Sequence, residues 1–143
     1  IIQMQARCVP GDQDPGRCLA YEARPGDVVV VPPGWAHATI SADPHQPLTF
    51  GAWCDRAYGF DYTGVRDHGG LAHFPVLDAQ GRLGFEPNPS YTPTDLERHE
   101  GQDLGRLGID KGVPIYLQYV QHRSRFDFVP DPSLLASVWR DFV

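Results

Sequence analysis

The sequence has no uninterrupted apolar run of the roughly 18 residues that a membrane-spanning helix needs. Its first residues also lack the basic segment and apolar stretch of a secretory signal peptide. Positive charge is sparse, because 12 Lys and Arg face 18 Asp and Glu, for a net charge of −6. A broad nucleic-acid footprint needs clustered Lys and Arg. We therefore expect a cytoplasmic protein that binds neither membranes nor nucleic acid, although a small anionic substrate needs only a local site.

Cysteine is scarce as well. The three residues, Cys8, Cys18 and Cys54, are an odd number and contain no C-x-x-C spacing. This usage favours free thiols in a reducing compartment, with a Cys8–Cys18 disulfide as the alternative. Cys54 follows an apolar stretch without an adjacent histidine, which indicates a buried, inert thiol in a strand.

Short strands separated by turns are expected in the first half of the chain. Residues 1–7 alternate apolar and polar side chains, the period of a half-buried strand. Residues 28–31 are four consecutive valines, typical of a strand buried on both faces. Further strands are expected at residues 19–23 and 48–53, with Pro/Gly turns at residues 10–16 and 25–26. Strands at this spacing indicate a sandwich or barrel.

The second half has a different pattern. Residues 69–77 and 82–85 predict a hairpin with its turn at Gln80-Gly81. Residues 86–111 are polar and rich in Pro and Gly, which predicts a long loop on the surface. An edge strand is expected at 113–120, because the segment alternates and contains a proline near its start. A helix is expected at 132–142, capped by Asp131 and with Pro132 at its first position. We divide the chain into a core, 1–80, and a C-terminal extension, 81–143.

One segment carries a candidate for chemistry. Gly26 is followed at fixed spacings by Pro32, Gly34 and His37 in Gly-Asp-Val-Val-Val-Val-Pro-Pro-Gly-Trp-Ala-His. The glycine turns the chain into the valine strand, and Pro-Pro-Gly forces a bend, so that His37 opens the next strand. A neutral imidazole held in this way suits a divalent metal, which predicts that His37 is a metal ligand. The alternative is a hydrogen-bonded core histidine; Trp35 is expected to pack.

The spacing of Gly26, Pro32, Gly34 and His37 resembles the second motif of the cupins, with Ser41 where that pattern ends in Asn. The resemblance implies an all-β cupin fold, a double-stranded β-helix or jelly-roll barrel. In this chain the barrel would be partial, with a C-terminal helix and a long loop extension.

The likeness narrows to the cupin-type glucose-6-phosphate isomerases of archaea and bacteria. It rests on Val-Pro-Pro-Gly-Trp-Ala-His37, on Gly59-Phe-Asp-Tyr62, where Phe60 stands in place of the His of some relatives, and on Asn88-Pro-Ser-Tyr91. It implies interconversion of glucose 6-phosphate and fructose 6-phosphate in gluconeogenesis or glycolysis. It further implies one divalent metal per site (Fe, Mn, Zn or Ni), a homodimer, and Asp61 and Tyr62 as candidate substrate-binding residues. For Asp61, capping a turn is the alternative; for Tyr62, the alternative is a core tyrosine with a hydrogen-bonded hydroxyl.

The first cupin motif, which supplies further His ligands and a Glu, has no counterpart here. No histidine precedes His37, and the only earlier acids are Asp12, Asp14 and Glu22. One histidine cannot hold a catalytic metal, which takes about three protein ligands. We therefore expect the acid–base glutamate to lie upstream of this sequence and the chain alone to be inactive. The alternatives are a non-catalytic cupin module that binds a sugar or supports an assembly, and another metal cupin such as an epimerase or dioxygenase.

The other histidines are expected to have structural or solvent roles. His45 lies between prolines in a loop, and His99 and His122 have polar neighbours in the sequence. The five-residue spacing of His68 and His73 argues against joint ligation, because it places them on opposite faces of a strand.

Overall fold

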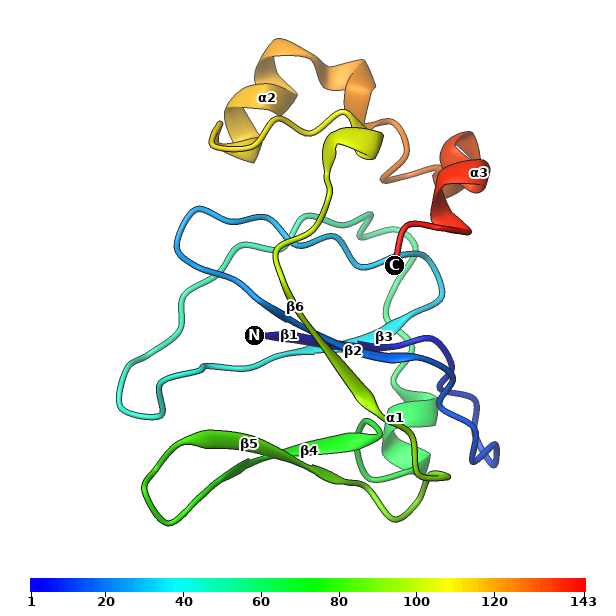
Figure 1. Ribbon diagram of the computed structural model, residues 1–143. Coiled ribbons are helices and arrows are strands. Elements are labelled where there is room, and N and C mark those ends of the chain that lie inside the picture. Colours follow the sequence, from blue (N-terminus) through cyan, green and yellow to red (C-terminus); the bar gives the residue numbers. More distant parts are fainter.

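A four-stranded sheet lies at the centre of the computed structural model, which describes residues 1–143 (Figure 1). The strand order is β3-β1-β2-β6. The first strand is antiparallel to both of its neighbours, whereas β6 is parallel to β2. The bounds are β1 Ile2–Gln5, β2 Cys18–Glu22, β3 Ala36–Thr39 and β6 Leu96–Glu100. The sheet is open, with β3 and β6 at its edges, and it does not close into a barrel.

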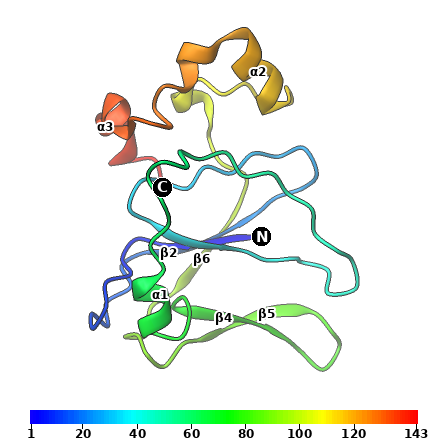
Figure 2. The same ribbon diagram turned by 180° about the vertical axis from the view of Figure 1, so that it is seen from behind.

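A hairpin lies beside this sheet, below it in Figure 1. Its strands are β4, His73–Leu77, and β5, Leu83–Pro87. The predicted turn at Gln80-Gly81 is confirmed: Gly81 has a φ of +75°, and its N–H donates to the Asp78 carbonyl at 2.8 Å. The short helix α1, Thr63–Asp67, lies at one end of the hairpin (Figure 2).

Short helices gather on the other side of the sheet, at the top of both views (Figures 1 and 2). They are η1 Gly105–Leu107, α2 Ile115–Gln121, η2 Arg123–Phe126, η3 Pro132–Leu135 and α3 Ala136–Trp139. Four side chains form their buried core: Leu107, Ile109, Phe126 and Phe128. None of these helices exceeds seven residues, so packing rather than intrinsic propensity maintains them.

The two faces of the central sheet differ in chemistry. One face carries the apolar cluster of Met4, Leu19 and Tyr21, against which Val143 packs. The other face places the amides of Gln3 and Gln5 toward the hairpin. The Gln3 amide donates to the His73 carbonyl at 3.0 Å, and the Gln5 oxygen accepts from the Ala72 N–H at 2.7 Å. Because both amides are hydrogen-bonded, they join the sheet to the hairpin, whereas the buried Nδ1 of His73 has no hydrogen-bond partner.

The valine run is not the buried strand that its composition predicts. Residues 28–31 form no strand and are only half-buried. The side-chain amide of Gln102 supplies what a neighbouring strand would. It accepts from the Val30 N–H at 2.7 Å and donates to the Val30 carbonyl at 2.9 Å. A side chain 72 residues away therefore satisfies the backbone of Val30 in place of a neighbouring strand, an arrangement that β-branched composition cannot reveal.

The strand predicted at residues 48–53 is also wrong. The segment has no regular structure and is exposed throughout. Cys54, predicted to be buried in that strand, is exposed as well, whereas Cys18 is buried; all three cysteines are free thiols. No neighbouring strand satisfies the backbone of residues 48–53, so their apolar character does not produce a strand.

The edge strand predicted at 113–120 is a helix instead. Ile115 and Tyr119 pack against the helical core and Gln118 is buried, whereas Tyr116, Leu117 and Val120 are exposed. Inward positions at 115, 118 and 119 follow a helical period, so the apparent alternation was misleading. Pro114 stands just before the helix, where a missing N–H costs little.

The remaining predictions hold in part. The strands expected at residues 1–7 and 19–23 are confirmed as β1 and β2. The helix predicted at 132–142 is two short pieces, η3 and α3, and the Asp131 carboxylate accepts from the Ser133 N–H as a cap. Residues 86–111 contain β6, so the extension expected from residue 81 onward contributes a strand to the central sheet. The chain is thus a small β-rich domain with short helices, and none of those helices could cross a membrane.

Candidate functional site

His37 lies on the edge strand of the central sheet. It is the second residue of β3 and pairs with Met4 of β1, which in turn pairs with Leu19 of β2. Residues paired directly across neighbouring strands share a face of the sheet. The imidazole therefore lies on the face of the sheet that carries the apolar cluster, at the solvent-exposed edge of that cluster.

The local fold brings the chain to this position as the motif requires. Gly26 and Gly34 adopt positive φ values of +93° and +81°, which favour glycine at both bends. The Trp35 N–H donates to the Pro32 carbonyl at 3.3 Å and closes the turn before β3. Trp35 itself packs against the apolar cluster, as expected, while the Ser41 hydroxyl donates to the Asp43 carbonyl at 2.8 Å.

His37 is solvent-accessible, yet surrounding protein atoms desolvate part of its ring. Desolvation is the main cause of a lowered His37 pKa, and the Trp35 backbone acts in the opposite direction. Burial disfavours the imidazolium, so the neutral ring, the form that binds metals, is favoured.

The potential metal donors that share a sheet face with His37 lie far from it. The same face carries Glu97 and His99, but both are on β6, three strands away. Three spacings of about 4.8 Å place them roughly 14 Å from β3, whereas metal–ligand bonds are near 2 Å. No group of three or more His, Cys, Asp or Glu side chains in the structure could hold a metal ion. The chain therefore fits one ligand position and does not by itself fit a metal.

Asp61 and Tyr62 lie immediately before α1. The Asp61 carboxylate accepts from the Thr63 N–H at 2.8 Å, and this hydrogen bond is the main cause of its lowered pKa. Tyr62 is 53% exposed, stacks with Phe60 at 6.3 Å and lies under the Arg66 guanidinium. No hydrogen bond joins either residue to His37. Asp61 thus caps a turn, the alternative given above, and substrate contact for both residues stays a prediction.

A buried cluster that the sequence patterns did not predict is centred on His68. Its two ring nitrogens lie 2.8 Å from the Gly64 carbonyl oxygen and 3.0 Å from that of Asp12. Its ring stacks on Tyr91 at 4.3 Å, and the Asn88 amide donates to the His68 carbonyl at 3.1 Å. Asn88 and Tyr91 belong to the Asn-Pro-Ser-Tyr segment of the family likeness. That segment was the sequence signal that could have identified this cluster, and in the structure its residues have a packing role.

The remaining histidines divide between core and surface. His73 is buried in β4, and its Nε2 lies 2.9 Å from the Thr94 carbonyl oxygen. His45 and His122 are exposed, as expected, whereas His99 is half-buried and stacks on Tyr21 at 5.1 Å. None of them belongs with His37 to a group of three or more potential metal donors.

Comparison with protein-family models, with curated proteins and with solved structures finds no match to this chain.

Proposed function

We propose that this chain is part of a cupin-type glucose-6-phosphate isomerase, to whose metal centre it contributes His37. The proposal is carried by the spacing from Gly26 through Pro32 and Gly34 to His37. It is supported by three features of that segment: glycine bends at both expected points, a histidine near the start of a strand, and an imidazole whose lowered pKa favours its neutral form.

The chemistry of aldose–ketose isomerisation explains why one histidine is not enough. The reaction moves hydrogen between two neighbouring carbons and needs a group that polarises the carbonyl oxygen, which a divalent ion such as Fe, Mn, Zn or Ni supplies when bound. His37 would hold one position of that ion. The other ligands and the acid–base glutamate would come from residues outside this sequence, so no step of the reaction is assigned to the chain alone.

The wider proposal keeps the expectations that follow from the family likeness. The substrate is a sugar phosphate, the assembly is a homodimer, and the enzyme is cytoplasmic. Asp61 and Tyr62 are the proposed substrate contacts from this chain; Tyr62 has an exposed hydroxyl-bearing ring suited to such contact.

The test uses the full-length product of the gene. Purified protein is assayed with fructose 6-phosphate, before and after removal of metal by a chelator, and its metal content is measured. We expect chelator-sensitive isomerase activity in the wild type. His37→Ala should lose bound metal and activity while keeping the wild-type circular dichroism spectrum. His45→Ala, which changes an exposed loop histidine, is the matched control and should behave as the wild type. Full metal occupancy in His37→Ala would contradict the ligand assignment.

A non-catalytic cupin module that binds a sugar or supports an assembly is the second candidate. The observation that favours it is that His37 belongs to no group of three or more potential metal donors in this chain. Absence of isomerase activity after metal reconstitution of the full-length protein would support this candidate. Metal-dependent activity on other substrates would instead indicate an epimerase or a dioxygenase.

A further inference from the structure

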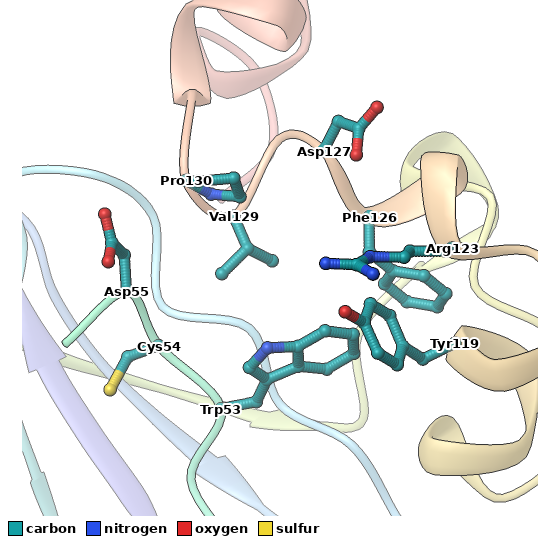
Figure 3. Close-up of a pocket in the computed structure, with 9 residues that line it drawn as sticks. All are labelled: Trp53, Cys54, Asp55, Tyr119, Arg123, Phe126, Asp127, Val129 and Pro130. Carbon is teal, nitrogen blue, oxygen red and sulfur yellow. The ribbon is translucent and has the colours of Figure 1, made fainter. Parts of the chain in front are cut away.

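A small cleft opens away from the central sheet, between residues 53–55 and the segment that begins on α2 and ends at Pro130 (Figure 3). Its volume is about 210 Å³. Aromatic rings form its floor. Trp53 meets Tyr119 edge to face at a centroid distance of 4.4 Å, and it lies 5.0 Å from Phe126. Phe126 is buried and anchors this floor to the helical core, while Trp53 remains 42% exposed.

The cleft also holds a guanidinium that has no partner within the chain. Arg123 makes no hydrogen bond and no ion pair; its only close interaction is with the Tyr119 ring, whose centroid is 5.7 Å away. Figure 3 shows its guanidinium pointing into the cleft. Arg125, two residues along, is different, because it donates to the Gly108 carbonyl and pairs with Asp110 at 2.9 Å. The five N–H donors of Arg123 are thus held over an aromatic floor and remain free.

Two carboxylates line the same cleft. The Asp127 side chain makes no hydrogen bond or ion pair, and that of Asp55 accepts one bond, from the Ala57 N–H at 2.9 Å. Neither carboxylate lies within ion-pairing distance of Arg123. The cleft therefore offers separated donors and acceptors beside an apolar floor, and its charged residues sum to a single negative charge.

These features select among ligand classes. A free anion such as phosphate would be attracted by Arg123 but repelled by the two carboxylates, and a cation would be attracted by the carboxylates but repelled by Arg123. A neutral ring with hydroxyl groups meets neither penalty: its hydroxyls can donate to Asp55 and Asp127 and accept from Arg123. One face of such a ring consists of C–H groups that can lie on the exposed indole of Trp53. The volume falls below the roughly 300–1,000 Å³ of pockets for drug-sized ligands, which suits a single ring.

We propose that this cleft is a binding site for a neutral monosaccharide ring, which packs on Trp53 and is hydrogen-bonded by Arg123 and Asp127. The proposal does not rest on the metal centre, because the cleft contains no residue of β3.

The test follows the indole N–H signal of Trp53 in NMR spectra of the present chain during titration with methyl α-D-glucopyranoside. We expect saturable shifts by roughly 10 mM, ten times the dissociation constant of a weak millimolar site. Arg123→Gln and Asp127→Asn should each weaken binding by about tenfold or more, the usual loss for a hydrogen bond to a charged group. Arg140→Gln is the matched control, since Arg140 is exposed outside the cleft.

Each other outcome overturns the proposal. Absence of saturable shifts would show that the cleft does not bind the sugar and that Arg123 contacts only solvent. If Arg123→Gln and Asp127→Asn bind the sugar as tightly as the wild type does, with both variants folded by circular dichroism, the sugar binds elsewhere. Tighter binding of glucose 6-phosphate would assign the cleft to an anion, and tighter binding of L-phenylalanine would assign it to a zwitterion. None of these outcomes depends on isomerase activity, so failure here is distinct from failure of the proposed function.

Discussion

Gly64 of helix α1 lies directly against the backbone carbonyl of Cys8. A Cβ atom added at Gly64 would lie 3.0 Å from the Cys8 sulfur and 2.6 Å from the Cys8 carbonyl carbon. It would lie closer to the Cys8 carbonyl oxygen than to either of these atoms. The carbonyl belongs to backbone that cannot move aside as a flexible side chain could. The helix can therefore approach the loop after β1 only because position 64 has no side chain.

Gly64→Ala should destabilise the protein by at least about 2 kcal/mol, because a methyl group forced into a packed site displaces backbone. Gly51→Ala is the matched control: a Cβ at Gly51 would meet no atom within 4 Å, and its φ is not in the left-handed region. The control should change the free energy of unfolding by less than about 1 kcal/mol. Urea unfolding of both variants measures the difference, and equal stability would contradict the close approach.

Gln102→Ala should cost about 1–3 kcal/mol, because it removes both hydrogen bonds to the Val30 backbone and leaves two half-buried polar groups without partners. Gln121→Ala, an exposed change at the end of α2, should cost less than about 0.5 kcal/mol. The measurement is urea unfolding together with hydrogen exchange at the Val30 amide. Undiminished protection of that amide in Gln102→Ala would show that the side chain does not replace a strand.

Cys18 predicts a loss of stability in alkali. Burial raises its pKa from the ordinary value of 9.0 to about 11. The folded state therefore keeps its proton where the unfolded state has lost it, so stability falls as pH rises between about 9 and 11. The full loss attributable to this thiol is about 2–3 kcal/mol.

The measurement is the free energy of unfolding of wild type and Cys18→Ala from about pH 8 upward. Other groups titrate in both proteins, so the gap between the two curves isolates the thiol. We expect that gap to shift in favour of Cys18→Ala as pH rises. Cys54→Ala serves as the control, because Cys54 is exposed, and its curve should run parallel to the wild type. A constant gap for Cys18→Ala would contradict the assignment.

Asp131→Ala should destabilise the C-terminal turn by about 1 kcal/mol, because it removes the cap bonds to the Ser133 N–H at 3.1 Å and hydroxyl at 2.6 Å. Asp131→Asn keeps an acceptor and should recover most of the loss. Asp141→Ala changes an exposed aspartate whose side chain makes no hydrogen bond and controls for the charge. Thermal unfolding measures all three; a loss in Asp131→Asn as large as in Asp131→Ala would argue against capping.

Features that depend only on residues close to one another in the sequence were predictable from the sequence. The β1 alternation, the hairpin turn at Gly81 and the Asp131 cap each rest on interactions within a few residues. The same is true around His37, since the glycine bends and the turn before β3 are local. The site beyond His37 was not predictable, because its neighbours on the sheet face come from β1, β2 and β6.

The sequence by itself therefore determined the turns, the cap, the first two strands and the position of His37 near a strand start. Tertiary structure alone decided the rest. The valines at 28–31 pair with no strand, and the backbone of Val30 is instead hydrogen-bonded by the side chain of Gln102. Residues 115–121 became a helix because Ile115 and Tyr119 pack into the helical core. The polar segment 96–100 became β6 because β2 accepts it as a parallel neighbour. The reason is common to all three: a backbone segment takes the conformation that satisfies its hydrogen bonds and apolar side chains, and those partners lie far away in sequence.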